Sequence, residues 1–211
     1  VVELVHLATL VHDDAVDHSA LRRGLPTVNA LWTHQVAVIM GDYLYSRGVS
    51  ELARIGNLEA LAVLANAANE MSVGEMRQLT SYDALDFTEA DYYRLIAAKT
   101  ASLMSAACEM GAIAGAPECR EALARYGHNL GMAFQIADDI LDVEGDAKKA
   151  GKRLQKDAKA GKATFVSHLG LTGAKSRASE LVETACDALA VYGTEAQTLQ
   201  DAARFVISRE S

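Results

Sequence analysis

Only two prolines, Pro26 and Pro117, interrupt this chain of 211 residues. Because proline breaks a helix interior, long helices can form on both sides of these positions, and the abundance of Ala and Leu favours them. Aromatic residues make up 6% of the chain, which is too few for the packed faces of a sheet protein. Half of the residues are hydrophobic, enough to bury a sizeable core. We therefore predict an all-α fold.

Helical periodicity divides the chain into segments separated by loops. The predicted helices cover Val1–His18, Ala30–Ala53, Leu58–Tyr82, Thr88–Ala114, Glu118–Val143, Ala174–Tyr192 and Glu195–Arg209. Thr88 followed three residues later by Asp91 predicts an N-terminal cap. We expect Ser19–Asn29 to be a loop and the Lys-rich stretch Glu144–Lys162 to be a mobile one. Since no linker divides the chain, we predict a single-domain bundle over residues 1–211.

Charge and cysteine content argue against several classes of protein. A formal net charge of −8 disfavours a nucleic-acid partner, because duplex binding depends on clustered Lys and Arg. Three cysteines are an odd number, so we expect free thiols in a cytoplasmic compartment. No apolar run reaches the roughly 18 residues of a membrane span. Residues Val1–Ala8 already have the pattern of a buried helix without a cap, so we expect the chain to begin inside a larger protein.

Two copies of an Asp-Asp-x-x-Asp pattern are the strongest functional signal. They consist of Asp13, Asp14 and Asp17, and of Asp138, Asp139 and Asp142. In a helix the first and last Asp of each copy lie one turn apart on one face, where like charges repel. We place both copies at the C-terminal end of an apolar helix, where the macrodipole also disfavours anions. A solvated helix end is the alternative for one copy, but two copies favour a function.

The ligand chemistry of these clusters suits magnesium. Carboxylate oxygens without accompanying Cys or His are the donors that magnesium prefers, and it shares its shell with substrate phosphates. Two clusters facing each other across a helical cavity would hold a metal-bridged diphosphate. A di-iron site is the rival, because Glu3-x-x-His6 has the required spacing. It needs a second such motif, and no other Glu has a His three residues on.

Cationic side chains follow each cluster, where a diphosphate would need them. Arg22 and Arg23 come after the first cluster, and Lys152 and Lys162 come after the second. Lys99 stands alone in an apolar segment between them, with a surface lysine as the alternative.

Two further polar residues share a helical face with a cluster. Gln135 lies one turn before Asp138, and His6 lies two turns before Asp13. A hydrogen-bonded core residue is the alternative for both.

These motifs resemble those of the trans-isoprenyl diphosphate synthases (polyprenyl synthetases), along essentially the whole chain. Besides the two clusters, the similar stretches are Arg22-Arg23-Gly24, Gly41-Asp42-Tyr43, Gly74-Glu75, Lys99-Thr100-Ala101, Phe134-Gln135-Ile136, Gly145-Asp146, Gly151-Lys152 and Gly161-Lys162-Ala163-Thr164. The resemblance implies a helical bundle of the isoprenoid synthase type around a central cavity, which works as a homodimer. It also implies the reaction, in which isopentenyl diphosphate lengthens an allylic diphosphate to an all-trans polyprenyl diphosphate.

The resemblance further implies residue roles. Three magnesium ions are expected, two bound by Asp13 and Asp17 and the third by Asp138. The catalytic set comprises all six cluster aspartates, namely Asp13, Asp14, Asp17, Asp138, Asp139 and Asp142, together with Lys99. The expected contacts of the allylic diphosphate are Arg22, Lys99, Lys152 and Lys162, with Thr100 and Gln135 near the cationic carbon. Arg23 and His6 would help to hold isopentenyl diphosphate.

One family segment is missing and two alternatives stay open. The family's Gly-Lys-x-x-Arg segment, upstream of the first cluster, is absent from this sequence, so we expect the domain to lack its N-terminal helices.

A class I terpene cyclase usually has Ser or Thr and then Glu where this chain has Asp142 and Asp146. A non-catalytic subunit of a heteromeric synthase tends to lose one cluster, and both are intact here.

The helix before the first cluster predicts product length. Ala8 and Thr9 lie about one turn before Asp13, and Val5 lies a turn deeper. In the family that this chain resembles, bulky residues at the positions of Ala8 and Thr9 block the tunnel and stop chain growth. Because both are small here, we expect a product of C20 or longer, with a C30–C50 tail favoured.

Overall fold

The computed structural model describes residues 1–80, 88–150 and 165–209, without the side chains of 146–150. It consists of two compact units, Val1–Leu64 and Ala65–Ser211, which are considered separately below. The boundary lies inside helix α4 (Leu58–Thr80). The fold is all-α, as predicted from the sequence. Among the helices of the described residues, none has the length and apolar character needed to cross a membrane.

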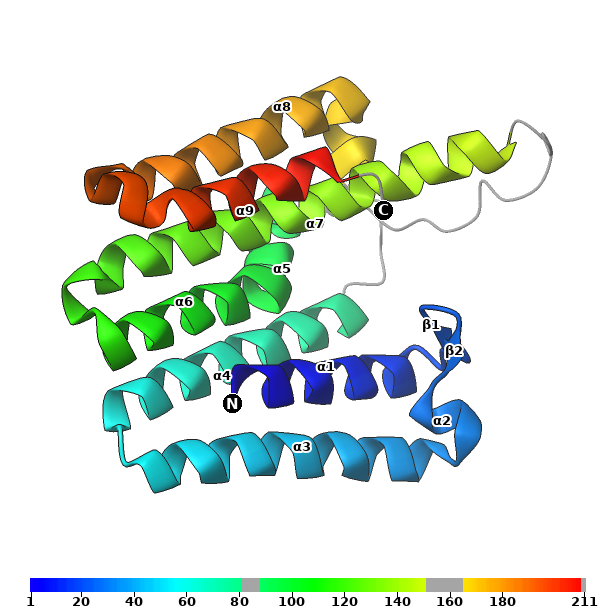
Figure 1. Cartoon of the computed structure of the whole chain (residues 1–211). Coiled ribbons are helices and arrows are strands. Elements are labelled where there is room, and N and C mark those ends of the chain that lie inside the picture. Colours follow the sequence, from blue (N-terminus) through cyan, green and yellow to red (C-terminus); the bar gives the residue numbers. More distant parts are fainter. Residues whose placement is uncertain (81–87, 151–164, 210–211) are drawn as a thin grey trace. The chain divides into compact units, whose positions relative to one another are not determined.

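The first unit is built around two long helices, α1 (Val2–Val16) and α3 (His34–Ile55), which pack side by side (Figure 1). Two glycines of α3 allow this packing. A Cβ at position 48 would lie 3.2 Å from Cγ2 of Val5, and a Cβ at position 41 would overlap the ring of His12. The side chains of Val5 and His12 therefore lie against α3.

A short hairpin and helix connect these two helices. Strands β1 (Leu21–Arg22) and β2 (Leu25–Pro26) pair antiparallel, and helix α2 (Val28–Leu31) follows. The hairpin turn consists of Arg23 and Gly24, with φ values of 51° and 77°. Two positive φ values are typical of the type I′ turn, which matches the twist of paired strands.

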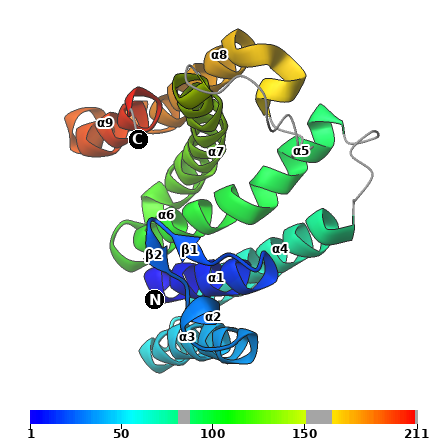
Figure 2. The same cartoon turned by 90° about the vertical axis from the view of Figure 1, so that its right-hand side faces the viewer.

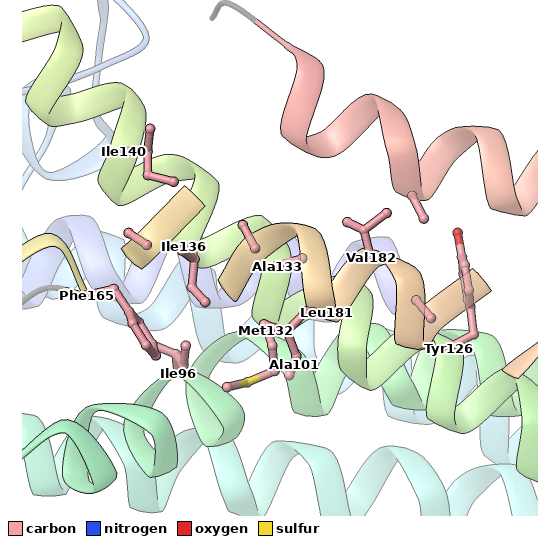
Figure 3. Close-up of a cluster of buried hydrophobic side chains, with 14 of the residues drawn as sticks. Ile96, Ala101, Tyr126, Met132, Ala133, Ile136, Ile140, Phe165, Leu181 and Val182 are labelled. Atoms are coloured by element: carbon pink, nitrogen blue, oxygen red, sulfur yellow. The ribbon is translucent and has the colours of Figure 1, made fainter. Parts of the chain in front are cut away.

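The second unit contains the rest of α4 and all later elements. They are α5 (Glu89–Ile96), the π-helix η1 (Ala97–Ala101), α6 (Ser102–Gly115), the 3-10 helix η2 (Pro117–Cys119), α7 (Arg120–Ala150), α8 (Phe165–Ala188), the 3-10 helix η3 (Ala190–Ala196) and α9 (Gln197–Ser208). Helix α7 packs against α6, α8 and α9 (Figure 2). Its apolar side chains, including Met132, Ile136 and Ile140, form a core with Ile96 of α5 and Phe165 of α8 (Figure 3).

Several predicted helix bounds were wrong. The helix expected over Ala30–Ala53 is broken before His34, where Thr33 caps α3 by accepting from the Val36 N–H. The loop expected from Glu144 does not begin there, since α7 continues to Ala150. Strong helix formers in this stretch outweigh Gly145, and Glu144 accepts from Lys175 of α8 at 2.6 Å.

Other expectations about local structure had mixed outcomes. Helix α8 begins at Phe165 rather than at Ala174, with Gly170 at φ 69° interrupting its first turns. The predicted cap is confirmed, because Thr88 and Asp91 form a capping box. The remainder of the Lys-rich stretch, residues 151–162 with Lys152 and Lys162, lies outside the described residues.

Candidate functional site

The first acidic cluster closes helix α1. Asp13 and Asp14 lie in its last turn, and Asp17 is the C-cap residue, so this cluster lies at a helix C-terminus as predicted. Asp14 is 7% exposed, and both of its carboxylate oxygens accept from Nε of Arg22, at 3.0 and 2.9 Å. This hydrogen bond is the main reason why the pKa of Arg22 is raised. Asp14 therefore holds Arg22 beside Asp13 and Asp17.

His12 fixes the same turn of α1 to α3, a contact that the sequence analysis missed. Its Nε2 lies 3.1 Å from the carbonyl oxygen of Val38 and 3.2 Å from Oδ1 of Asp42. Both neighbours are acceptors, so the contact fits the tautomer that carries its hydrogen on Nε2. Gly41, which lacks a Cβ, makes room for the ring. The Gly41-Asp42 pair thus holds the residue directly before Asp13.

The second acidic cluster lies in the interior of α7. Because this helix continues to Ala150, the placement of Asp138, Asp139 and Asp142 at a helix end was wrong, and macrodipole repulsion does not apply to them. Asp139 is 7% exposed, so its carboxylate lies in the interior. It accepts from the hydroxyl of Tyr92 at 2.5 Å, from the N–H of Phe165 at 3.2 Å and from Nε2 of Gln135 at 3.4 Å. Burial raises the pKa of Asp139, and these three hydrogen bonds oppose the rise.

Asp138 forms an ion pair with Arg209, the last residue that the structure describes. Its Oδ1 accepts from the guanidinium of Arg209, which lies over the Phe134 ring at 4.1 Å from the centroid. Burial raises the pKa of Asp138, and the charge of Arg209 opposes the rise. Nε of Arg209 is buried without a hydrogen-bond partner among the described residues. One N–H group of this ion pair therefore lacks a hydrogen-bond acceptor among the described residues.

Lys99 lies in the π-helix η1, a helical form that often occurs at functional sites. Its ammonium group pairs with the Glu75 carboxylate and donates to Oε1 of Gln78 at 2.7 Å, both from α4. Gly74 permits this approach, since a Cβ there would lie 3.0 Å from Cγ of Lys99. Lys99 is partly buried and held by two partners, which contradicts the alternative of a surface lysine.

Thr100 and Gln135 meet beside the second cluster. The hydroxyl of Thr100 donates to Oε1 of Gln135 at 3.2 Å, which joins η1 to α7. The second unit thus places two neutral oxygens beside the carboxylate cluster, linked through Gln135 to Asp139.

The other predicted site residues lie apart from these contacts. His6 and Arg23 are exposed, and Arg23 has a positive φ that a non-glycine residue seldom adopts. Val5 and Ala8 are buried in α1, with Val5 facing α3, while the hydroxyl of Thr9 donates to the carbonyl oxygen of His6 at 2.8 Å.

An all-helical fold that carries two acidic clusters, one next to Arg22 and the other next to Arg209, defines a protein of the isoprenoid synthase class. More specifically, the chain belongs to the polyprenyl synthetase family, whose model matches residues 1–202. It is 45% identical over 166 residues to an all-trans-nonaprenyl-diphosphate synthase (geranyl-diphosphate specific) of Rhodobacter capsulatus. The aligned residues make up 78% of this chain and 51% of the relative. The chain spans about half the length of the curated relatives it matches.

Solved structures show the same fold. A decaprenyl diphosphate synthase from Rhodobacter capsulatus has a TM-score of 0.89 and 35% identity, covering 100% of this chain and 78% of the other. A polyprenyl synthase from Caulobacter crescentus CB15, complexed with calcium and isoprenyl diphosphate, has a TM-score of 0.84 and 31% identity, covering 100% and 77%.

Proposed function

We propose that this chain is the catalytic body of a magnesium-dependent trans-prenyl transferase. It would add isopentenyl diphosphate to an allylic diphosphate and give an all-trans polyprenyl diphosphate of C20 or longer. The observation that carries this proposal is the shared arrangement of the two acidic clusters. In each, the middle carboxylate is buried and hydrogen-bonded to a neighbouring element, and the outer carboxylates lie one turn apart.

The outer carboxylates fit magnesium because their donors are hard oxygens, which this ion prefers. We assign three ions to Asp13, Asp17 and Asp138. Bound magnesium supplies positive charge that stabilises the leaving diphosphate. The solved Caulobacter relative is complexed with calcium and isoprenyl diphosphate, which supports binding of both a divalent ion and a diphosphate. Arg209 would have to leave Asp138 for an ion to bind there.

Cationic side chains would meet the diphosphate of the allylic substrate. Arg22 is held toward the first cluster by Asp14, and Lys99 is held by Glu75 and Gln78. Lys152 and Lys162 are further proposed contacts, but they lie outside the described residues. These side chains bind and orient the leaving group.

The reaction needs no protein nucleophile. When the allylic C–O bond breaks, the bonding electrons leave with the diphosphate and an allylic cation forms beside the oxygens of Thr100 and Gln135. The double bond of isopentenyl diphosphate then supplies the electrons of the new C–C bond. Loss of a proton to the departed diphosphate gives the trans double bond of the product. His6 and Arg23 are the proposed contacts of isopentenyl diphosphate.

The proposal extends to assembly and location. Exposed apolar side chains follow one stretch of α3, including Val36, Ile39, Met40 and Tyr43, and support burial of this helix in a homodimer. The three cysteines are free thiols, which supports a cytoplasmic location. The family model spans both compact units, which supports one polyprenyl synthetase domain.

The test is incubation of the complete protein with isopentenyl and farnesyl diphosphates and magnesium, followed by chromatography of the products. The proposal expects a ladder of longer prenyl diphosphates that ends at C20 or beyond. A hydrocarbon or alcohol without diphosphate would instead identify a class I terpene cyclase. A complete absence of product would favour a non-catalytic subunit.

A further inference from the structure

Tyr92 of α5 is a part of the second cluster that no sequence motif marked. Its side chain is 5% exposed, and its hydroxyl donates to Oδ2 of Asp139 at 2.5 Å. The N–H of Phe165, the first residue of α8, donates to the same oxygen at 3.2 Å. Tyr92 thus fixes a carboxylate that joins three helices, α5, α7 and α8.

The other oxygen of this carboxylate determines how an amide is turned. Oδ1 of Asp139 lies 3.4 Å from Nε2 of Gln135. A carboxylate can only accept, so the NH2 group of Gln135 faces Asp139 and the amide oxygen faces away from it. That oxygen accepts from the hydroxyl of Thr100 at 3.2 Å. The orientation matters because an amide oxygen attracts a developing cation, whereas an NH2 group repels one.

We propose that Tyr92 is a positioning residue for the prenyl transfer. It holds Asp139, and through Asp139 it holds the Gln135 amide with its oxygen toward the allylic cation. This inference rests on the proposed function, because it assumes that the cation forms beside Thr100 and Gln135. Without the Tyr92 hydroxyl, Asp139 keeps its place in α7 but loses the donor that fixes its rotation. The Gln135 amide is then free to turn.

The neighbouring Tyr93 provides a matched control. Both rings pack edge-on against Phe165, with centroid separations of 5.2 Å for Tyr92 and 5.0 Å for Tyr93. The hydroxyl of Tyr93, however, accepts from Arg177 and not from a cluster residue. Removal of either hydroxyl therefore leaves the aromatic packing in place. Only removal of the Tyr92 hydroxyl takes a hydrogen bond from Asp139.

The experiment compares Tyr92→Phe, Tyr93→Phe, Gln135→Leu and the double variant Tyr92→Phe with Gln135→Leu in the complete protein. The rate of one condensation is measured at saturating magnesium, with KM for both diphosphates and the thermal midpoint of unfolding. We expect Tyr92→Phe to lower kcat about tenfold to a hundredfold, because a hydrogen bond to a charged group is lost. KM should stay within about twofold of the wild-type value, and Tyr93→Phe should keep both constants. In the Gln135→Leu background, Tyr92→Phe should cause little further loss.

Three outcomes would overturn the inference while the proposed function stands. They are equal, small effects of the two tyrosine variants, an additive loss in the double variant, and a loss of kcat that follows a fall in the thermal midpoint. A wild-type protein that forms no lengthened product overturns the proposed function, and this inference with it.

Discussion

The carboxylates of Asp14 and Asp139 are buried to the same extent and both orient a neighbour. Asp14 holds Arg22, and Asp139 holds Gln135 and the start of α8. Single substitutions can therefore separate folding from chemistry within one cluster. The middle carboxylate contributes to stability through its partners, and the outer ones add like-charge repulsion that a bound cation would relieve.

The first prediction compares adjacent aspartates. Asp13→Asn should lower turnover by orders of magnitude and keep or raise the thermal midpoint, because it removes a proposed metal ligand and one of the crowded charges at a helix C-terminus. Asp14→Asn should lower the free energy of unfolding by about 1 kcal/mol, since the Arg22 side of the pair is 38% exposed. Turnover against magnesium concentration and thermal unfolding are the measurements. Near wild-type turnover with an unchanged magnesium optimum in Asp13→Asn would remove the metal assignment.

The second prediction concerns the ion pair of Arg209 with Asp138. This guanidinium competes with any cation at Asp138, so Arg209→Gln should lower the magnesium concentration for half-maximal activity by about threefold to tenfold. Arg204→Gln is the control, because Arg204 of α9 pairs with Asp201 at 3.1 Å and, among the described residues, contacts no member of either cluster. An identical magnesium requirement in both variants would show that Arg209 does not compete.

At the scale of the helices, the features that residue spacing alone predicted are those formed within one helix. Each acidic cluster and the capping box of Thr88 depend on residues three or four positions apart, which one helix brings together. Tyr92 and Asp139 are 47 residues apart, and Lys99 and Gln78 are 21 apart. Such contacts depend on helix packing, which periodicity does not specify. The bounds of α7 were missed for a related reason, since Gly145 was given more weight than the helix formers around it.

The third prediction tests the contact between α7 and η1. A Cβ at Gly131 would lie 2.5 Å from Cα of Ala101, directly beside Thr100. Gly131→Ala should therefore force the two backbones apart, with a loss of about 1–3 kcal/mol in the free energy of unfolding and a loss of activity. Gly111→Ala in α6 is the control, because a Cβ there meets nothing within 4 Å. It should stabilise the protein by about 0.5–1 kcal/mol. Denaturant unfolding of both variants measures the difference, and equal effects would contradict the packing argument.

At the scale of the whole molecule, the polyprenyl synthetase family model matches residues 1–202 and so runs through both compact units. The first cluster belongs to the unit Val1–Leu64 and the second to the unit Ala65–Ser211.

The last prediction relates the length of the product to positions along α1. Thr9 lies one turn before Asp13 and is partly exposed, whereas Ala8 is fully buried. At ~1.5 Å rise per residue, one turn of helix corresponds to about one extended isoprene unit. Thr9→Phe should thus shorten the products, with little loss of the first condensation, because a ring would block the path of the growing tail. Ala8→Phe should also lower the thermal midpoint, since a buried site must accept a ring. Chromatography of the products decides the matter, and unaltered lengths in an active Thr9→Phe variant would show that the tail does not pass this face.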